Sequence, residues 1–98
     1  MSKFLNLWEM DYSRMPADPK ERMAMQKKQL EAVIKMLNEG EIIDWGIFPG
    51  GGSGFGISEG TEADALRRAM QFIPYAKFQT FPVLSASEVV EVMKSLQA

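Results

Sequence analysis

Carboxylates are the side chains of this sequence best suited to general-base chemistry, because the chain contains neither histidine nor cysteine. Glu9 and Asp11 lie on the first expected strand and share its parity with Leu5 and Leu7, and Asp44 lies within the second expected strand beside Trp45. Apolar neighbours desolvate an ionised carboxylate and raise its pKa, which suits proton abstraction near neutral pH. We therefore take Glu9 and Asp44 as candidate catalytic residues. The alternative is structural, since strand acids commonly lie at a sheet edge or pair with a basic residue, for which Lys77 and Arg14 are the candidates.

Aromatic residues are numerous for so short a chain, at 10% of the sequence. Those with an apolar body and a polar tip are typical of small-molecule pockets, whereas core packing is the alternative explanation for most of them. The candidate pocket residues are Trp8, Trp45, Phe55 and Tyr75. Without histidine or cysteine, histidine-ligated haem and the usual zinc sites are excluded. We expect no metal and no cofactor.

The glycine-rich segment 50–56 does not match a phosphate-binding loop. No window fits G-x-G-x-x-G, no lysine follows at the required spacing, and a short strand is expected next instead of a helix. We interpret it as a hairpin that could also form a mobile lip over a pocket. A net charge of −2 argues against a nucleic-acid partner. The longest uncharged run, 45–58, is interrupted by Pro49 and glycines, and no signal-peptide pattern is present, so we expect no membrane segment and a cytoplasmic location.

The 98 residues suit a single domain, 1–98. Periodicity and capping signals predict, in order, a strand at 3–12, a helix capped at 18 and running to about 38, a strand at 41–48, a returning arm at 54–58, a helix capped at 61 and stopped at 74, a strand at 75–83 and a helix capped at 85. This β-α-β-β-α-β order with an added C-terminal helix is the ferredoxin-like plan. The expected fold class is therefore α+β, with a four-stranded antiparallel sheet and two helices on one face.

The first expected helix and the C-terminal helix carry apolar residues at three- and four-residue spacing, which predicts one buried stripe on each. In the first helix the expected stripe is Met23, Leu30, Val33, Ile34 and Leu37, with Met25, Ala32 and Met36 as a thinner flank. In the C-terminal helix it is Val89, Val92, Met93 and Leu96.

The expected sheet is apolar on both sides, although two helices cover only one face. We take Phe4, Trp8 and Met10 as the uncovered set, with each side chain worth about 1.5–3 kcal/mol when buried. Monomers rarely leave such a patch bare, so we expect a second copy packed sheet to sheet as a dimeric α+β barrel. The partner is then the protein itself, as a homodimer or larger homo-oligomer. The alternative is that the C-terminal helix shields the bare face.

The segment Met70–Leu84, which reads MQFIPYAKFQTFPVL, resembles the second-helix-to-fourth-strand region of muconolactone isomerase-like proteins. The resemblance implies a dimeric α+β barrel or larger ring, with a pocket between sheet and helices. It also implies a cofactor-free proton shift in a small unsaturated lactone. Along the second strand, where that family carries basic and histidine side chains, this chain has Asp44-Trp45-Gly46-Ile47. The resemblance therefore bears more directly on fold than on activity.

We expect a small-molecule-binding dimeric α+β barrel protein, or a cofactor-independent isomerase-like enzyme acting on a small unsaturated or aromatic-derived compound. A cofactor-free oxygenase on the same scaffold is a close relative of that hypothesis. The alternative is a non-catalytic dimeric interaction or ligand-sensing domain. A cavity holding Glu9, Asp44 or Tyr75 beside apolar walls favours the first hypothesis, and a filled interior favours the second.

Overall fold

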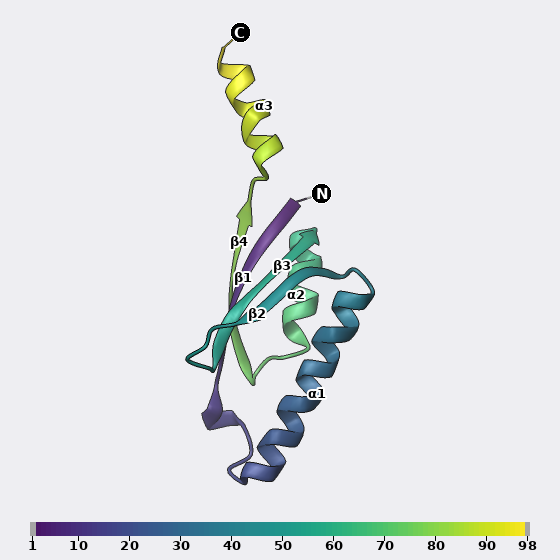
Figure 1. The fold of residues 1–98 in the computed structure, drawn as a ribbon, viewed down its shortest axis with the longest axis vertical. Coiled ribbons are helices and arrows are strands. Elements are labelled where there is room, and N and C mark those ends of the chain that lie inside the picture. Colours follow the sequence, from purple (N-terminus) through teal and green to yellow (C-terminus); the bar gives the residue numbers. More distant parts are fainter. Residues whose placement is uncertain (1, 98) are drawn as a thin grey trace.

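The computed structural model describes residues 2–97 and has the predicted ferredoxin-like architecture (Figure 1). Its elements are β1 (Ser2–Met10), a 3-10 turn η1 (Tyr12–Arg14), α1 (Pro19–Asn38), β2 (Ile42–Ile47), β3 (Ser53–Gly60), α2 (Glu62–Met70), β4 (Ala76–Val83) and α3 (Ala86–Leu96). The four strands form one antiparallel sheet in the order β2-β3-β1-β4, and α1 and α2 lie on the same face of it (Figure 1). The α+β class and the β-α-β-β-α-β order with a C-terminal helix are thus confirmed.

The ends of the helices follow local capping chemistry. Asp18 Oδ2 accepts a hydrogen bond from the Glu21 backbone N–H at 3.3 Å and begins α1, with Pro19 in its first turn. Gly40 follows α1 with a φ of 74°, a left-handed conformation that glycine adopts without a Cβ clash. Capping boxes at Thr61 and Ser85 begin α2 and α3. The predicted starts of the three helices and the end of α1 are confirmed, whereas α2 ends at Met70, before the predicted stop at Pro74.

The face of α1 that packs on the sheet differs from the prediction. Val33 and Met36 are buried, whereas Met23 is 71% exposed. Leu30, Ile34 and Leu37 of the expected stripe are exposed as well. Since apolar residues occupy much of the circumference of α1, their spacing alone does not decide which side turns toward the sheet.

The helix-covered face of the sheet is also the opposite of the one expected. Phe4 and Trp8 are buried beneath the helices, and Met10 shares their side of β1, so the assignment of these three residues to an uncovered set is wrong. The uncovered side instead carries apolar residues from β1, β3 and β4. We call this the open face: Leu5, Leu7, Phe55, Ile57, Phe81 and Val83. Because both sides of β1 are apolar, alternation alone allowed either orientation.

The register of the strands defines the open face. Leu5 lies opposite Ile57 on β3 and Phe81 on β4. Leu7 lies opposite Phe55. Residues directly opposed in antiparallel strands point to the same side of the sheet, so these side chains form one cluster.

Helix α3 projects away from the rest of the molecule as a continuation of β4 (Figure 1). All its side chains are exposed, which contradicts the expected burial of Val89, Val92, Met93 and Leu96, and α3 does not shield the open face. The extents of 62 × 26 × 22 Å and the radius of gyration of 16.2 Å reflect this extension, since a compact chain of this length has a radius of about 13 Å. Only Leu84 and Ser85 separate β4 from α3.

Candidate functional site

A cavity of about 340 Å³ lies between the helix-covered face of the sheet and the helices α1 and α2. The sheet supplies Trp8 and Trp45, α1 supplies Val33 and Met36, and α2 contributes the small residue Ala69. Most of the lining is apolar, and the volume is within the range of small-ligand sites. The interior between the sheet and the helices is therefore not filled by side chains of this chain.

The two tryptophans form one wall of the cavity. Trp8 on β1 and Trp45 on β2 stack with ring centroids 5.3 Å apart and an interplanar angle of 7°. The indole Nε1 of Trp8 donates a hydrogen bond to the backbone oxygen of Phe55 at 3.3 Å, which fixes the orientation of that ring. Such a stacked pair contributes about 0.5–1.5 kcal/mol beyond its buried area. The wall is thus a flat aromatic surface held in place by the sheet.

Strand β3 lies between the two tryptophan-bearing strands and carries only small residues on its cavity side. Gly54, Gly56 and Ser58 point to that side because they lie opposite Trp8, Asn6 and Phe4. A Cβ built at Gly54 would collide with the Trp8 ring and the Gly46 carbonyl oxygen. The alternating small residues therefore make room for the indole stack and for the cavity above it.

The predicted hairpin is confirmed, with a turn over residues 48–52 and strand β3 returning beside β2. The later part of the glycine-rich segment has a second role that the sequence reasoning missed. Gly54 and Gly56 lie within β3 under the tryptophan pair, not in a mobile lip. The signal was present as glycine at every second position, which places both residues on one face of a strand.

The cavity floor contains a small polar network centred on Asn6. Its Nδ2 donates to Ser58 Oγ at 3.0 Å and to the Gly56 carbonyl at 3.4 Å, and its Oδ1 accepts from Thr80 Oγ1 at 2.9 Å. Ser58 is 1% exposed. Both the amide and the hydroxyl are thus paired inside an otherwise apolar wall, as buried polar groups require.

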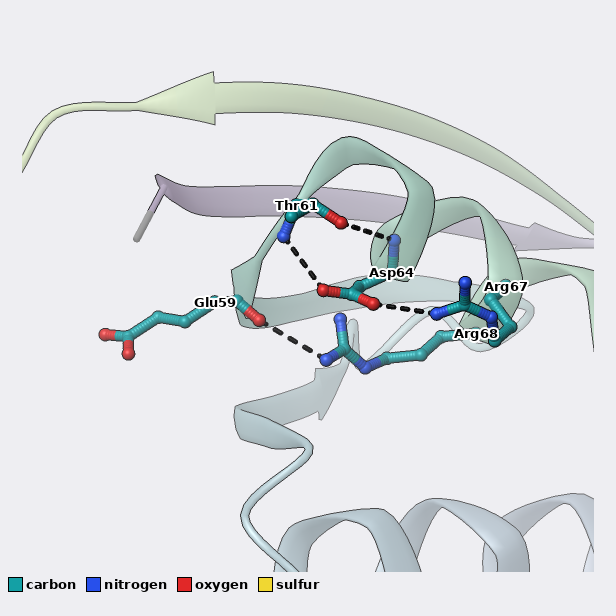
Figure 2. Close-up of polar contacts among 5 residues, drawn as sticks. All are labelled: Glu59, Thr61, Asp64, Arg67 and Arg68. Atoms are coloured by element: carbon teal, nitrogen blue, oxygen red, sulfur yellow. Dashed lines mark hydrogen bonds and ion pairs between the residues drawn. The ribbon is translucent and has the colours of Figure 1, made fainter.

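Arg68 brings a positive charge to the cavity from α2. Its Nη2 donates to the Glu59 carbonyl oxygen at 3.3 Å (Figure 2). Its Nη1 is buried and has no hydrogen-bond partner among the described residues, and none of the ion pairs within residues 2–97 involves Arg68. A buried donor on a charged group without a partner is uncommon in folded proteins. Arg68 is therefore the most unusual polar group of the cavity.

A neighbouring arginine on the same helix has an ordinary structural role. Arg67 Nη1 lies 2.7 Å from Asp64 Oδ1, and Asp64 also accepts the Thr61 backbone N–H at 3.0 Å (Figure 2). Hydrogen bonds from the Thr61 backbone and hydroxyl, and then the Arg67 guanidinium, lower the pKa of Asp64 from its ordinary 3.8 to about 2. This capping cluster holds the start of α2, the helix that carries Arg68 into the cavity.

The structure places the predicted pocket residues on two sides of the sheet. Trp8 and Trp45 line the cavity together. Phe55 belongs to the open face, where its ring covers Gly46. Tyr75 is half-buried at the start of β4, and its carbonyl oxygen accepts the Asp11 backbone N–H at 2.8 Å. The residues that line the cavity do not include Phe55 or Tyr75.

The two predicted catalytic acids lie on the side of the sheet opposite the cavity. Glu9 is exposed and lies opposite Lys77 in the register of β1 and β4. Asp44 is exposed on the edge strand β2, where its Oδ1 accepts the Trp45 backbone N–H at 2.8 Å. The structure therefore places neither Glu9 nor Asp44 at the cavity, and it does not bring the two acids together. Sequence reasoning missed Asn6, Ser58 and Arg68, because isolated polar residues give no spacing signal.

Within the described part of the chain, no group of three acidic, histidine or cysteine residues is arranged to hold a metal ion. None of the helices in residues 2–97 has the length and apolar character needed to cross a bilayer.

Comparison with known protein families identifies this chain as a member of one family. Residues 2–97 match the family described as "Domain of unknown function (DUF3303)", so the chain belongs to that family over nearly its whole length. No curated protein matches the sequence.

Proposed function

We propose that this protein binds a small, flat and largely apolar molecule in the cavity between its sheet and its helices. The observation that carries the proposal is the cavity of about 340 Å³ beside the stacked Trp8 and Trp45. Its volume is within the range of small-ligand sites, and an apolar ligand that displaces water from an aromatic wall gains hydrophobic and stacking free energy. An interaction domain with a filled interior is the alternative, and the cavity favours ligand binding over it.

A cofactor-independent isomerase-like activity on an unsaturated or aromatic-derived compound is the catalytic form of this proposal. Its support is the resemblance of residues 70–84 to muconolactone isomerase-like proteins and the ferredoxin-like fold. The side chains that line the cavity include no aspartate or glutamate, while Glu9 and Asp44 lie on the other side of the sheet. Binding is therefore the part of the proposal that the cavity supports most directly.

The proposed assembly is a homodimer in which two open faces pack against each other. Leu5, Leu7 and Phe81 belong to an apolar cluster that α1 and α2 do not cover. A two-fold axis through this cluster gives each copy the same partner surface, which is how most homodimers associate. The cytoplasmic location and the absence of a nucleic-acid partner remain predictions from the sequence.

Helix α3 provides a second argument for a partner copy. Val89, Val92, Met93 and Leu96 recur along one side of the helix and are all exposed in the single chain. Short helices are marginal in water unless an apolar side is packed, so α3 needs a surface to cover it. Because α3 continues from β4, whose Phe81 and Val83 belong to the open face, a copy bound there lies close to α3.

A thermal-shift screen of small lactones, catechol derivatives and aromatic acids tests the binding proposal. A ligand that binds the native state raises the melting temperature by mass action, and binding at the cavity also changes tryptophan fluorescence. Ala69→Phe fills the cavity from α2, whereas Ala63→Phe adds the same ring at an exposed position of that helix. We expect hits with the wild type and Ala63→Phe and their loss in Ala69→Phe. Equal shifts in all three proteins would place the binding site elsewhere.

A further inference from the structure

We propose that Arg68 is an anion anchor, so that the ligand of the cavity carries a carboxylate attached to a flat apolar body. This inference rests on the proposed function of the cavity as a ligand site, and it specifies the chemical class of the ligand. The juxtaposition that supports it is a buried, unpartnered guanidinium nitrogen in the same cavity as a stacked tryptophan pair.

The guanidinium is held in position by the backbone of β3. Arg68 Nη2 donates to the Glu59 carbonyl, which fixes the group at the end of the cavity where β3 meets α2 (Figure 2). That bond leaves Nη1, which carries two N–H donors, without an acceptor among residues 2–97. The nearest acid on the same side of α2, Asp64, is engaged by Thr61 and Arg67 instead.

Burial of a charged donor without an acceptor is costly, so a structure that retains one commonly supplies an acceptor from a ligand. A carboxylate fits best, because guanidinium and carboxylate groups match in shape and form short charge-assisted hydrogen bonds. The apolar remainder of the cavity favours a single charged group over a polyanion such as a nucleotide. The tryptophan wall favours a planar body.

Ser58 supplies a second donor near the base of the cavity. Its hydroxyl is buried and accepts from Asn6 Nδ2, and that bond uses an oxygen lone pair. The hydroxyl keeps its own proton to donate toward a bound group. Arg68 and Ser58 both line the cavity, together with the stacked Trp8 and Trp45.

Matched acid and amide ligands test the anchor. Benzoate and cinnamate are compared with benzamide and cinnamamide by calorimetric titration at neutral pH, because each pair has the same shape and differs in charge. We expect the wild type to bind the acids about 10- to 100-fold more tightly than the amides, the range of a buried charge-assisted hydrogen bond. Arg68→Met should abolish this preference.

Arg67→Met is the matched control, because Arg67 lies next in sequence, is 72% exposed at its side chain and pairs with Asp64 outside the cavity. It should keep the preference for acids. Arg68→Lys retains the positive charge without the guanidinium plane and should keep part of the preference, which guards against a folding defect in the methionine variant.

Three results would overturn the inference. Equal affinity of the wild type for acids and amides would remove the anchor but leave the cavity as a binding site. Retention of the acid preference by Arg68→Met would place the anionic group elsewhere. Failure of every acid and every amide to bind would contradict the proposed function of the cavity itself.

Discussion

Replacing Leu7 with lysine places a charge in the apolar cluster of the open face. Leu7 lies on β1 opposite Phe55, and it is half-buried in the single chain. Full burial of a leucine is worth about 1.5–3 kcal/mol, so the half-buried Leu7 gains roughly 1 kcal/mol more when an interface covers it. Leu7→Lys loses this gain. A two-fold axis doubles this loss to about 2 kcal/mol, and burial of two unpaired ammonium groups adds a penalty of several kcal/mol.

These terms sum to at least about 4 kcal/mol, which corresponds to an increase of about 10³-fold or more in the dimer dissociation constant. Sedimentation equilibrium at micromolar concentration should report a dimer for the wild type and an 11.0 kDa monomer for Leu7→Lys. Met23→Lys introduces the same side chain on α1, where Met23 is 71% exposed, and should remain dimeric. A wild type that is monomeric over this range, or a Leu7→Lys variant with the wild-type mass, would refute the open-face dimer.

Two further predictions concern stability. Gly54→Ala should lower the free energy of unfolding, measured in urea, by about 1–3 kcal/mol, because the added Cβ collides with Trp8. The control Gly50→Ala, whose added Cβ has no atom within 4 Å, should change it by about 0.5 kcal/mol or less. Equal effects of the two substitutions would contradict the close packing at β3. The folded pKa of Asp64, about 2, lies below its ordinary 3.8, so the ionised carboxylate stabilises the fold above about pH 4 and this contribution is lost as the pH falls toward 2. Asp64→Asn should therefore flatten the fall of melting temperature between pH 4 and 2, and an unchanged slope would count against the capping cluster.

The order of the elements was predictable because it depends on short-range signals. Asp18, Thr61 and Ser85 are each followed three residues later by an acidic residue, and each caps a helix as predicted. Pro82 near the end of the last strand favours an edge position, because proline has no backbone N–H to donate, and β4 is an edge strand of the sheet. These features follow from backbone hydrogen bonding within one or two turns of chain.

The orientation of two-sided elements was not predictable from the same signals. Phe4 and Leu5 are both large and apolar, so alternation in β1 does not say which of them faces the helices. The same ambiguity affects α1, where Met36 is buried and Met23 is exposed. Contacts between residues distant in the sequence decide both orientations.

The candidate site was predicted in part. The structure places Trp8 and Trp45 together at the cavity, while it places Glu9 and Asp44 across the sheet from it. Glu9 does share one side of β1 with Leu5 and Leu7, but that side is the open face. Asp44 was selected for its neighbour Trp45, yet adjacent residues of a strand point to opposite faces. The sequence carries no signal for Arg68, because its position depends on a hydrogen bond to the Glu59 backbone outside its own helix.

The central claim, that a small molecule occupies the cavity beside the stacked tryptophans, is tested most directly by two-dimensional ¹H–¹⁵N NMR. The chain contains two tryptophans, so its spectrum has two indole N–H signals, and both rings line the cavity. Titration with a hit from the thermal-shift screen should move both signals to saturation. Saturating ligand that leaves both indole signals in place, while shifting the amides of Leu5 and Leu7 on the open face, would contradict the claim.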